Sequence, residues 1–69
     1  MEPLPIIVNG YNTLFTECSD ASGSFLLIAI PPSAGKDIAN LAGTVLNGHL
    51  IKMVDFAKNN DVRFIKAYY

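Results

Sequence analysis

Residues 34–59 carry the longest regular pattern of apolar and polar side chains in the chain. At about 100° per residue, the apolar side chains fall on one broad side of a helix and the polar ones on the other. The polar stripe keeps its phase across Asn47 and Gly48, so the pattern favours one helix, continuous or kinked, from about Ala34 to Asn59. The glycine weakens such a helix by roughly 1 kcal/mol relative to alanine. The apolar side comprises Ile38, Leu41, Ala42, Val45, Leu46, Leu50, Met53, Val54, Phe56 and Ala57.

A break at Asn47-Gly48 is the alternative, because glycine just past a helix end is a stop signal and Asn-Gly is a strong turn. Residues 49–56 would then form a strand. Their alternation is poor, since each face would mix a charged or polar group with apolar ones. The choice between one helix and two segments stays open at this point.

The first thirty residues predict three strands. Residues 4–8 and 11–18 form a hairpin around Asn9-Gly10, a two-residue sequence typical of such turns. Residues 19–24 are small and polar, which indicates a flexible loop. Residues 25–30 are apolar on both faces, as in a central strand covered on both sides.

Residues 62–69 alternate weakly and predict a last strand, which completes the order β-β-β-α-β. We therefore expect one small α+β domain over residues 1–69, with a three- to four-stranded mixed sheet covered on one face by the long helix. The strands before and after the helix would run parallel, joined by a right-handed crossover. A chain of 69 residues buries only about 60% of its unfolded surface, so its stability is marginal.

The composition excludes disulfide bonds and metal ions as sources of additional stability. The single cysteine, Cys18, excludes an internal disulfide, and one cysteine with one histidine, His49, offers no metal-ligand spacing. We therefore predict no metal and no cofactor. A net charge of −1 without charge blocks does not favour nucleic acid or an anionic membrane as partner. The start of the chain lacks a signal-like segment, and a reduced cytoplasmic setting is expected.

Association with another chain remains as the source of stability. A helix of about 25 residues is roughly 37 Å long and would overhang strands of roughly 17 to 27 Å. The helix overhang and the apolar strand 25–30 both predict a homodimer or a higher oligomer. The predicted interface residues are Leu26, Ile28, Leu50, Met53, Phe64 and Tyr68.

The segment from Ser33 to Lys36 has two interpretations: helix capping alone, which accounts for these residues, and an anion site as the alternative. Ser33 is placed as N-cap, and the N–H groups of Ala34, Gly35 and Lys36, with the lysine ammonium, would face a phosphate or carboxylate. The segment is not a P-loop, because Ile30 stands where that motif needs glycine and Asp37 where it needs serine or threonine.

No paired acids, metal ligands or activated nucleophile occur at a recognisable spacing, so the sequence does not predict an enzyme. The leading hypothesis is a small non-catalytic, homo-oligomeric module, a regulator or inhibitor that binds a protein partner through an apolar and aromatic surface. The alternative is an oligomer that binds a nucleotide or another anion at Ser33 to Lys36.

Overall fold

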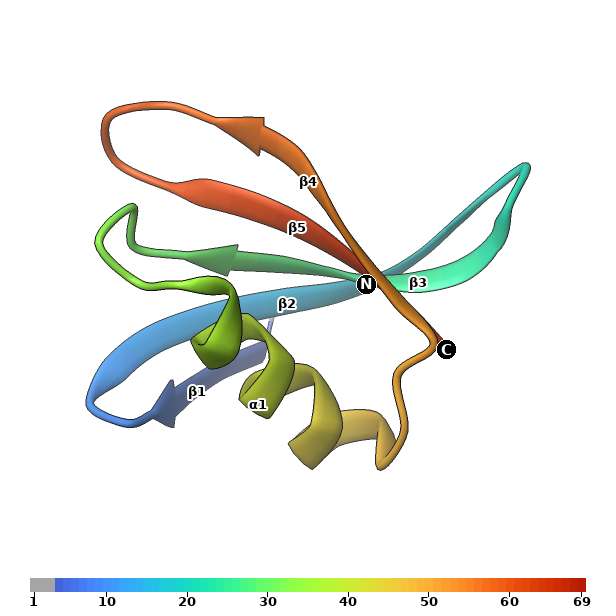
Figure 1. Ribbon diagram of the computed structural model, residues 1–69, viewed down its shortest axis with the longest axis horizontal. Helices are drawn as coiled ribbons and strands as arrows, with labels where there is room; N and C mark the ends of the chain where they lie inside the picture. The colour runs from blue at the N-terminus through green and yellow to red at the C-terminus, as the bar shows by residue number, and fades with distance from the viewer. Residues whose placement is uncertain (1–3) are drawn as a thin grey trace.

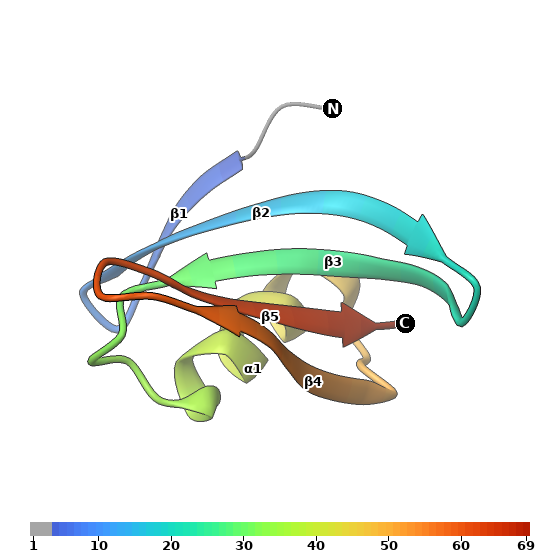
Figure 2. The ribbon, with the colours of Figure 1, turned by 90° about the horizontal axis from the view of Figure 1, so that it is seen from above.

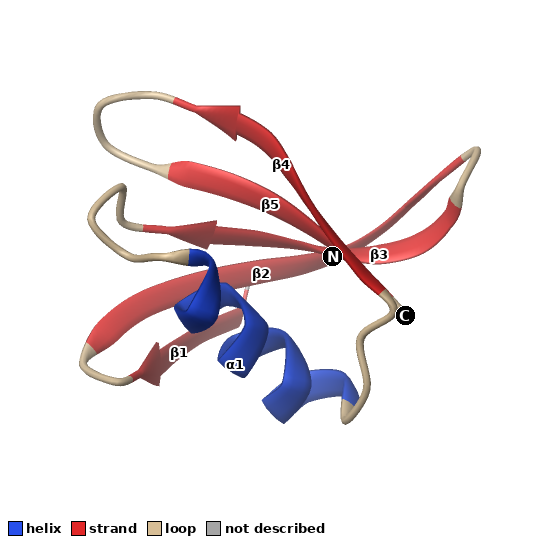
Figure 3. Ribbon diagram, viewed as in Figure 1, coloured by secondary structure: helices blue, strands red, loops and turns tan. Residues whose placement is uncertain are grey.

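The computed structural model describes residues 4–69, which form one five-stranded antiparallel sheet and one helix (Figures 1 and 3). This confirms the α+β class. The prediction of three to four strands in a mixed sheet is wrong, because the strand order β1-β2-β3-β5-β4 is antiparallel at every pairing. The elements are β1 (Leu4–Val8), β2 (Tyr11–Asp20), β3 (Gly23–Ile30), α1 (Lys36–Asn47), β4 (Lys52–Lys58) and β5 (Arg63–Tyr68).

The first hairpin forms as predicted. Asn9 and Gly10 take positive φ angles of 50° and 83°, the backbone that a type I′ turn requires at both central positions. The turn pairs Val8 with Tyr11, and this register puts Ile6 opposite Thr13. Thr13 is fully buried, and its hydroxyl donates to the carbonyl oxygen of Ile6 at 2.9 Å. The buried hydroxyl is therefore satisfied.

The predicted flexible loop at 19–24 is a tight turn instead. β2 extends to Asp20 and β3 begins at Gly23, so Ser19 pairs with Ser24 in the sheet. The Ser22 N–H donates to Oδ1 of Asp20 at 2.7 Å, and Gly23 has φ of 122°. A polar sequence does not prevent strand pairing when an aspartate closes the turn. The hairpin projects beyond the rest of the sheet (Figures 1 and 2).

The helix ends at Asn47, so the long helix predicted to Asn59 is wrong and the break at Asn47-Gly48 is confirmed. Gly48 has φ of 72° and ψ of −36°, and the His49 N–H donates to the Asn47 carbonyl at 2.7 Å. These values describe a γ-turn, a conformation that strains any L-residue with a Cβ. The chain after it becomes β4, whose alternation is poor because it is an edge strand with a bulge between Asp55 and Ala57.

The predicted parallel crossover is also wrong. The helix leads to the edge strand β4, and the chain then turns back to place β5 between β4 and β3. The additional strand reverses the direction, so β3 and β5 are antiparallel neighbours with Ile28 opposite Ile65.

The core lies between α1 and one face of the sheet. α1 packs over β1, β2, β3 and β5 (Figure 1). The helix contributes small side chains, and Gly43 allows Leu50 to fold back against it. This close approach brings the chain after α1 into the same core. The buried cluster comprises Phe15, Leu26, Ile28, Ile30, Ala34, Ala39, Ile65 and Ala67.

Candidate functional site

The sheet face that α1 leaves open includes three cross-strand rows of side chains. The strand register aligns Leu14, Ala29 and Phe64 in one row and Thr16, Leu27, Lys66 and Val54 in the next. The third row holds Cys18, Phe25, Tyr68 and Lys52. We call these three rows, with Phe56 from the bulge of β4, the uncovered face.

The uncovered face is largely apolar and partly hollow. The side chains of Leu14 and Phe56 are 44% and 56% exposed. Leu14, Thr16, Leu27, Ala29 and Phe64 contribute to the wall of a shallow cavity of about 190 Å³. Neighbouring exposed apolar residues on one face mark an interaction surface more than scattered ones do.

Lys66 lies within this apolar surface with its charge compensated. Its ammonium is 4.9 Å from the centroid of the Phe25 ring and 4.7 Å from that of Phe56. It also lies 3.1 Å from Oδ2 of Asp20, and the Tyr68 hydroxyl donates a hydrogen bond to the same oxygen at 2.9 Å. Cation–π contacts and a carboxylate together hold the lysine in place.

These contacts shift proton affinities at this end of the sheet. Partial burial raises the pKa of Asp20, but hydrogen bonds from Tyr68, Ser22 and Lys66 outweigh it, so the pKa lies below its usual value. Partial burial and the hydrogen bond to Asp20 raise the pKa of Tyr68. The hydrogen bond from Tyr69 to Glu17 raises the pKa of Tyr69 in the same way. Both tyrosines therefore hold their protons as donors.

The six predicted interface residues divide between the two faces of the sheet. Leu26 and Ile28 are buried beneath the helix, with 6% and 0% exposure, so they offer no surface to a second copy. Leu50 and Met53 are half-buried and pack against the same core. Only Phe64 and Tyr68 lie on the uncovered face. Side chains of residues 25–30 alternate between the helix side and the uncovered face. Both sets are apolar, so the sequence does not tell which of them is buried beneath the helix.

The predicted anion site has a different arrangement from the expected one. Gly35, not Ser33, precedes the first residue of α1, and it makes no side-chain cap. Ser33 is exposed. Ala34 is buried, and its N–H donates to the carbonyl of Pro31 at 2.9 Å, so this N–H does not face a ligand.

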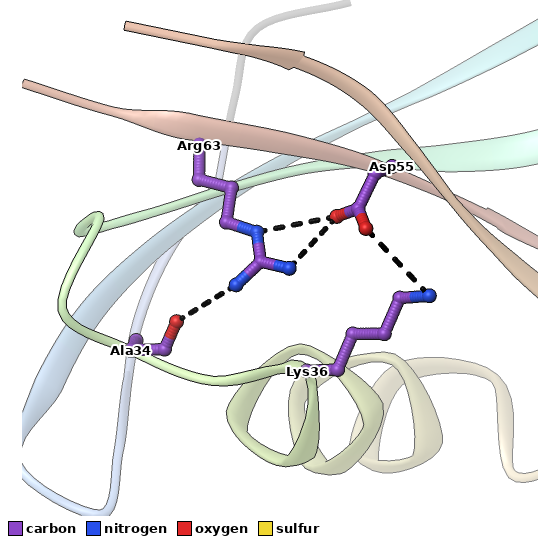
Figure 4. A network of polar contacts seen from close by, with 4 residues as sticks. All are labelled: Ala34, Lys36, Asp55 and Arg63. Carbon is purple, nitrogen blue, oxygen red and sulfur yellow. Dashed lines mark hydrogen bonds and ion pairs between the residues drawn. The ribbon is translucent and has the colours of Figure 1, made fainter. Parts of the chain in front are cut away.

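The cations near the helix start converge on Asp55 (Figure 4). Nη2 and Nε of Arg63 lie 3.0 and 3.2 Å from its Oδ1, and Nζ of Lys36 lies 3.7 Å from its Oδ2. Nη1 of Arg63 also donates to the Ala34 carbonyl at 3.4 Å. The carboxylate of Asp55 thus takes the place of an external anion. Sequence reasoning missed this pair because it put Asp55 in the helix.

Cys18 and His49 show no arrangement that supports chemistry. Cys18 is a half-buried free thiol on the uncovered face, and His49 is exposed just after the γ-turn. Among residues 4–69, no three His, Cys, Asp or Glu side chains gather into a group suited to a metal ion. Within the same range, no helix combines the length and the apolar character needed to cross a membrane.

Comparisons with protein-family models, with curated protein sequences and with solved structures give no significant match. The functional argument therefore depends on the geometry of the chain itself.

Proposed function

We propose that this protein is a small non-catalytic, homo-oligomeric interaction module, a regulator or inhibitor that binds a protein partner. Its copies join through the uncovered face of the sheet. The observation that supports this proposal is the row of Leu14, Ala29 and Phe64, which leaves apolar side chains and a hollow on the face opposite the helix. Covering them with a second copy removes this apolar surface from water.

The size of the face suits a small dimer. A side of a body with principal extents of 29 × 24 × 22 Å has an area on the order of 600 Å², against about 800 Å² per partner in a standard interface. Packing of two sheets face to face is a common solution for a sheet with one bare apolar face. The two edge strands favour self-association less than the uncovered face does. Pro5 in β1 lacks an N–H donor, and β4 has a lysine at each end, Lys52 and Lys58.

Sedimentation equilibrium of two matched variants tests this proposal. At micromolar concentration we expect the wild-type protein to have a mass of at least two chains. Leu14→Glu places a carboxylate on the uncovered face and should give a folded monomer. The control is Leu41→Glu on the helix, because Leu41 is 42% exposed and Leu14 is 44% exposed. A monomeric wild type, or dissociation by Leu41→Glu alone, contradicts the proposal.

The alternative, binding of a nucleotide or another anion at Ser33 to Lys36, has weaker support. Lys36 and Arg63 share the carboxylate of Asp55, and Asp37 adds a second carboxylate in the first turn of α1, so no net positive charge is left for an external anion. Exposed ion pairs of this kind contribute little and exchange partners readily. A thermal-shift screen against nucleotides and phosphates, with Lys36→Ala as control, decides whether this alternative is kept.

A further inference from the structure

The strand β4 combines an open edge, two cavities and most of the positive charge of the chain. In the part of the chain that the structure describes, β4 pairs with β5 alone. The outward backbone N–H and C=O groups of such an edge form a template for another strand. Strand addition is a recurring way for a protein to bind an extended peptide.

Both larger cavities border this strand. Residues 55–58 of β4 and Arg63 line a cavity of about 430 Å³. Ile51, Lys52 and Val54 line a second one of about 440 Å³, together with Tyr68, Tyr69 and the turn 22–24. Each cavity has residues of β4 in its wall, one toward each end of the strand, and side chains of an added strand alternate between the two faces of the sheet. The cavities therefore offer space for side chains of an added strand.

Most of the basic residues of the chain gather at this edge. Four of the five basic residues of the chain, Lys36, Lys52, Lys58 and Arg63, lie on β4 or beside it. The carboxylate of Asp55 compensates one of these charges, and Lys66, the fifth basic residue, is paired with Asp20. Asp37 follows Lys36 in the chain and Asp61 lies in the turn between β4 and β5, so the positive charge that is open to a partner is that of Lys52 and Lys58, which make no ion pair within residues 4–69.

The same charges disfavour pairing of β4 with β4 of a second copy. An antiparallel pair centred on Asp55 places Lys52 opposite Lys58 of the second copy, and Lys58 opposite Lys52. Like charges directly opposite each other destabilise a strand pair. An acidic strand in the same position meets a lysine near each end, which is favourable.

We propose that β4 is the docking strand for an acidic, extended segment of a partner protein, which adds to the sheet as a further strand. This inference rests on the proposed function, because it gives the chemistry of the protein partner that the module binds. It uses the outward backbone groups of β4, whereas the proposed self-association is supported by the row of Leu14, Ala29 and Phe64 on β2, β3 and β5. A monomeric wild type therefore does not decide whether β4 docks a peptide.

NMR titration of ¹⁵N-labelled protein tests the proposal with two synthetic probes. One is a terminally blocked peptide of alternating threonine and glutamate, about eight residues long to match the strand. The other has lysine in place of glutamate. We expect the acidic peptide to shift amide resonances of residues 51–58 and the basic peptide to leave them unchanged. Equal effects of both peptides, or shifts confined to the row of Leu14, Ala29 and Phe64, overturn the proposal.

Two further measurements separate strand addition from simple charge attraction. The double variant Lys52→Gln with Lys58→Gln should lower the affinity for the acidic peptide at least tenfold, while Asn12→Glu with Thr44→Glu should not, because it changes the net charge equally at exposed positions outside β4. N-methylation of one alternate set of peptide residues should abolish binding, and methylation of the other set should preserve it. If both methylated peptides bind like the parent, no strand is added.

Discussion

Replacement of Gly48 by alanine tests the point at which the structure departs most from the sequence pattern. In the structure Gly48 has φ of 72°, and a Cβ built there meets no atom within 4 Å. Any loss of stability thus comes from the backbone conformation alone. An L-residue in the left-handed region costs about 1–2 kcal/mol, so Gly48→Ala should lower the free energy of unfolding by that amount.

The expected fall in melting temperature is large enough to measure simply. For a domain of 60–100 residues, 1 kcal/mol corresponds to about 4–8 °C, so Gly48→Ala should lower Tm by about 4–16 °C. Urea denaturation followed by circular dichroism gives the free energy directly and checks that the m-value is unchanged.

The control places a D-amino acid, which has the opposite chirality, at the same position. The chain is short enough for chemical synthesis, and Gly48→D-Ala accepts a positive φ without strain. The D-residue restricts the unfolded chain and should stabilise the protein by about 0.4–1 kcal/mol. A helix continuing through Gly48 predicts the reverse order, since L-alanine favours a right-handed helix and D-alanine disrupts it. An L-alanine variant as stable as the wild type would refute the γ-turn.

Three further results are expected. Thr13→Val removes the buried hydroxyl that donates to a β1 carbonyl and should cost about 1 kcal/mol in urea denaturation; an unchanged midpoint contradicts this role. Ala39→Leu overfills a fully buried site beneath the helix and should cost about 1–3 kcal/mol, whereas Ala57→Leu at an exposed site should not. Because the pKa of Asp20 is lowered on folding, its contribution to stability is present above the ordinary pKa of 3.8 and is lost as the pH falls through the lowered value. Asp20→Asn should therefore flatten the acid limb of a plot of stability against pH, and an unchanged limb contradicts the assignment.

The sequence predicted those elements whose local signals agree with each other. The Asn9-Gly10 turn between two β-branched or alternating segments gave the first hairpin, and the apolar run 25–30 gave most of β3. In each case the turn residues and the side-chain pattern indicate the same structure. The tertiary structure then needs only to extend the strands by a few residues.

The second half of the fold was not predictable from side-chain periodicity. Residues 49–57 continue the apolar phase of the helix by coincidence, and the edge position and bulge of β4 remove the alternation that a strand normally shows. The positive φ of Gly48 distinguishes the two structures, and after this turn Leu50 folds back against Gly43. That contact is tertiary and has no local signal.

The candidate site was predictable only in part for the same reason. Phe64 and Tyr68 were found from the apolar and aromatic character of the last strand. The pairing of Asp55 with Arg63 requires both residues to lie on neighbouring strands, which the predicted helix prevented. A hairpin prediction for 52–68 would have placed them close together.

The position of β5 between β3 and β4 affects the order in which the protein can assemble during synthesis. β1, β2 and β3 pair with their neighbours in the chain as soon as each has emerged. β4 emerges before β5 and has no strand to pair with until β5 has followed it. During that interval the edge of β3 stays open, and it becomes a site where a second nascent chain can insert its own β5. If two chains exchange an element in this way, the strand order makes the β4–β5 hairpin the element that is exchanged.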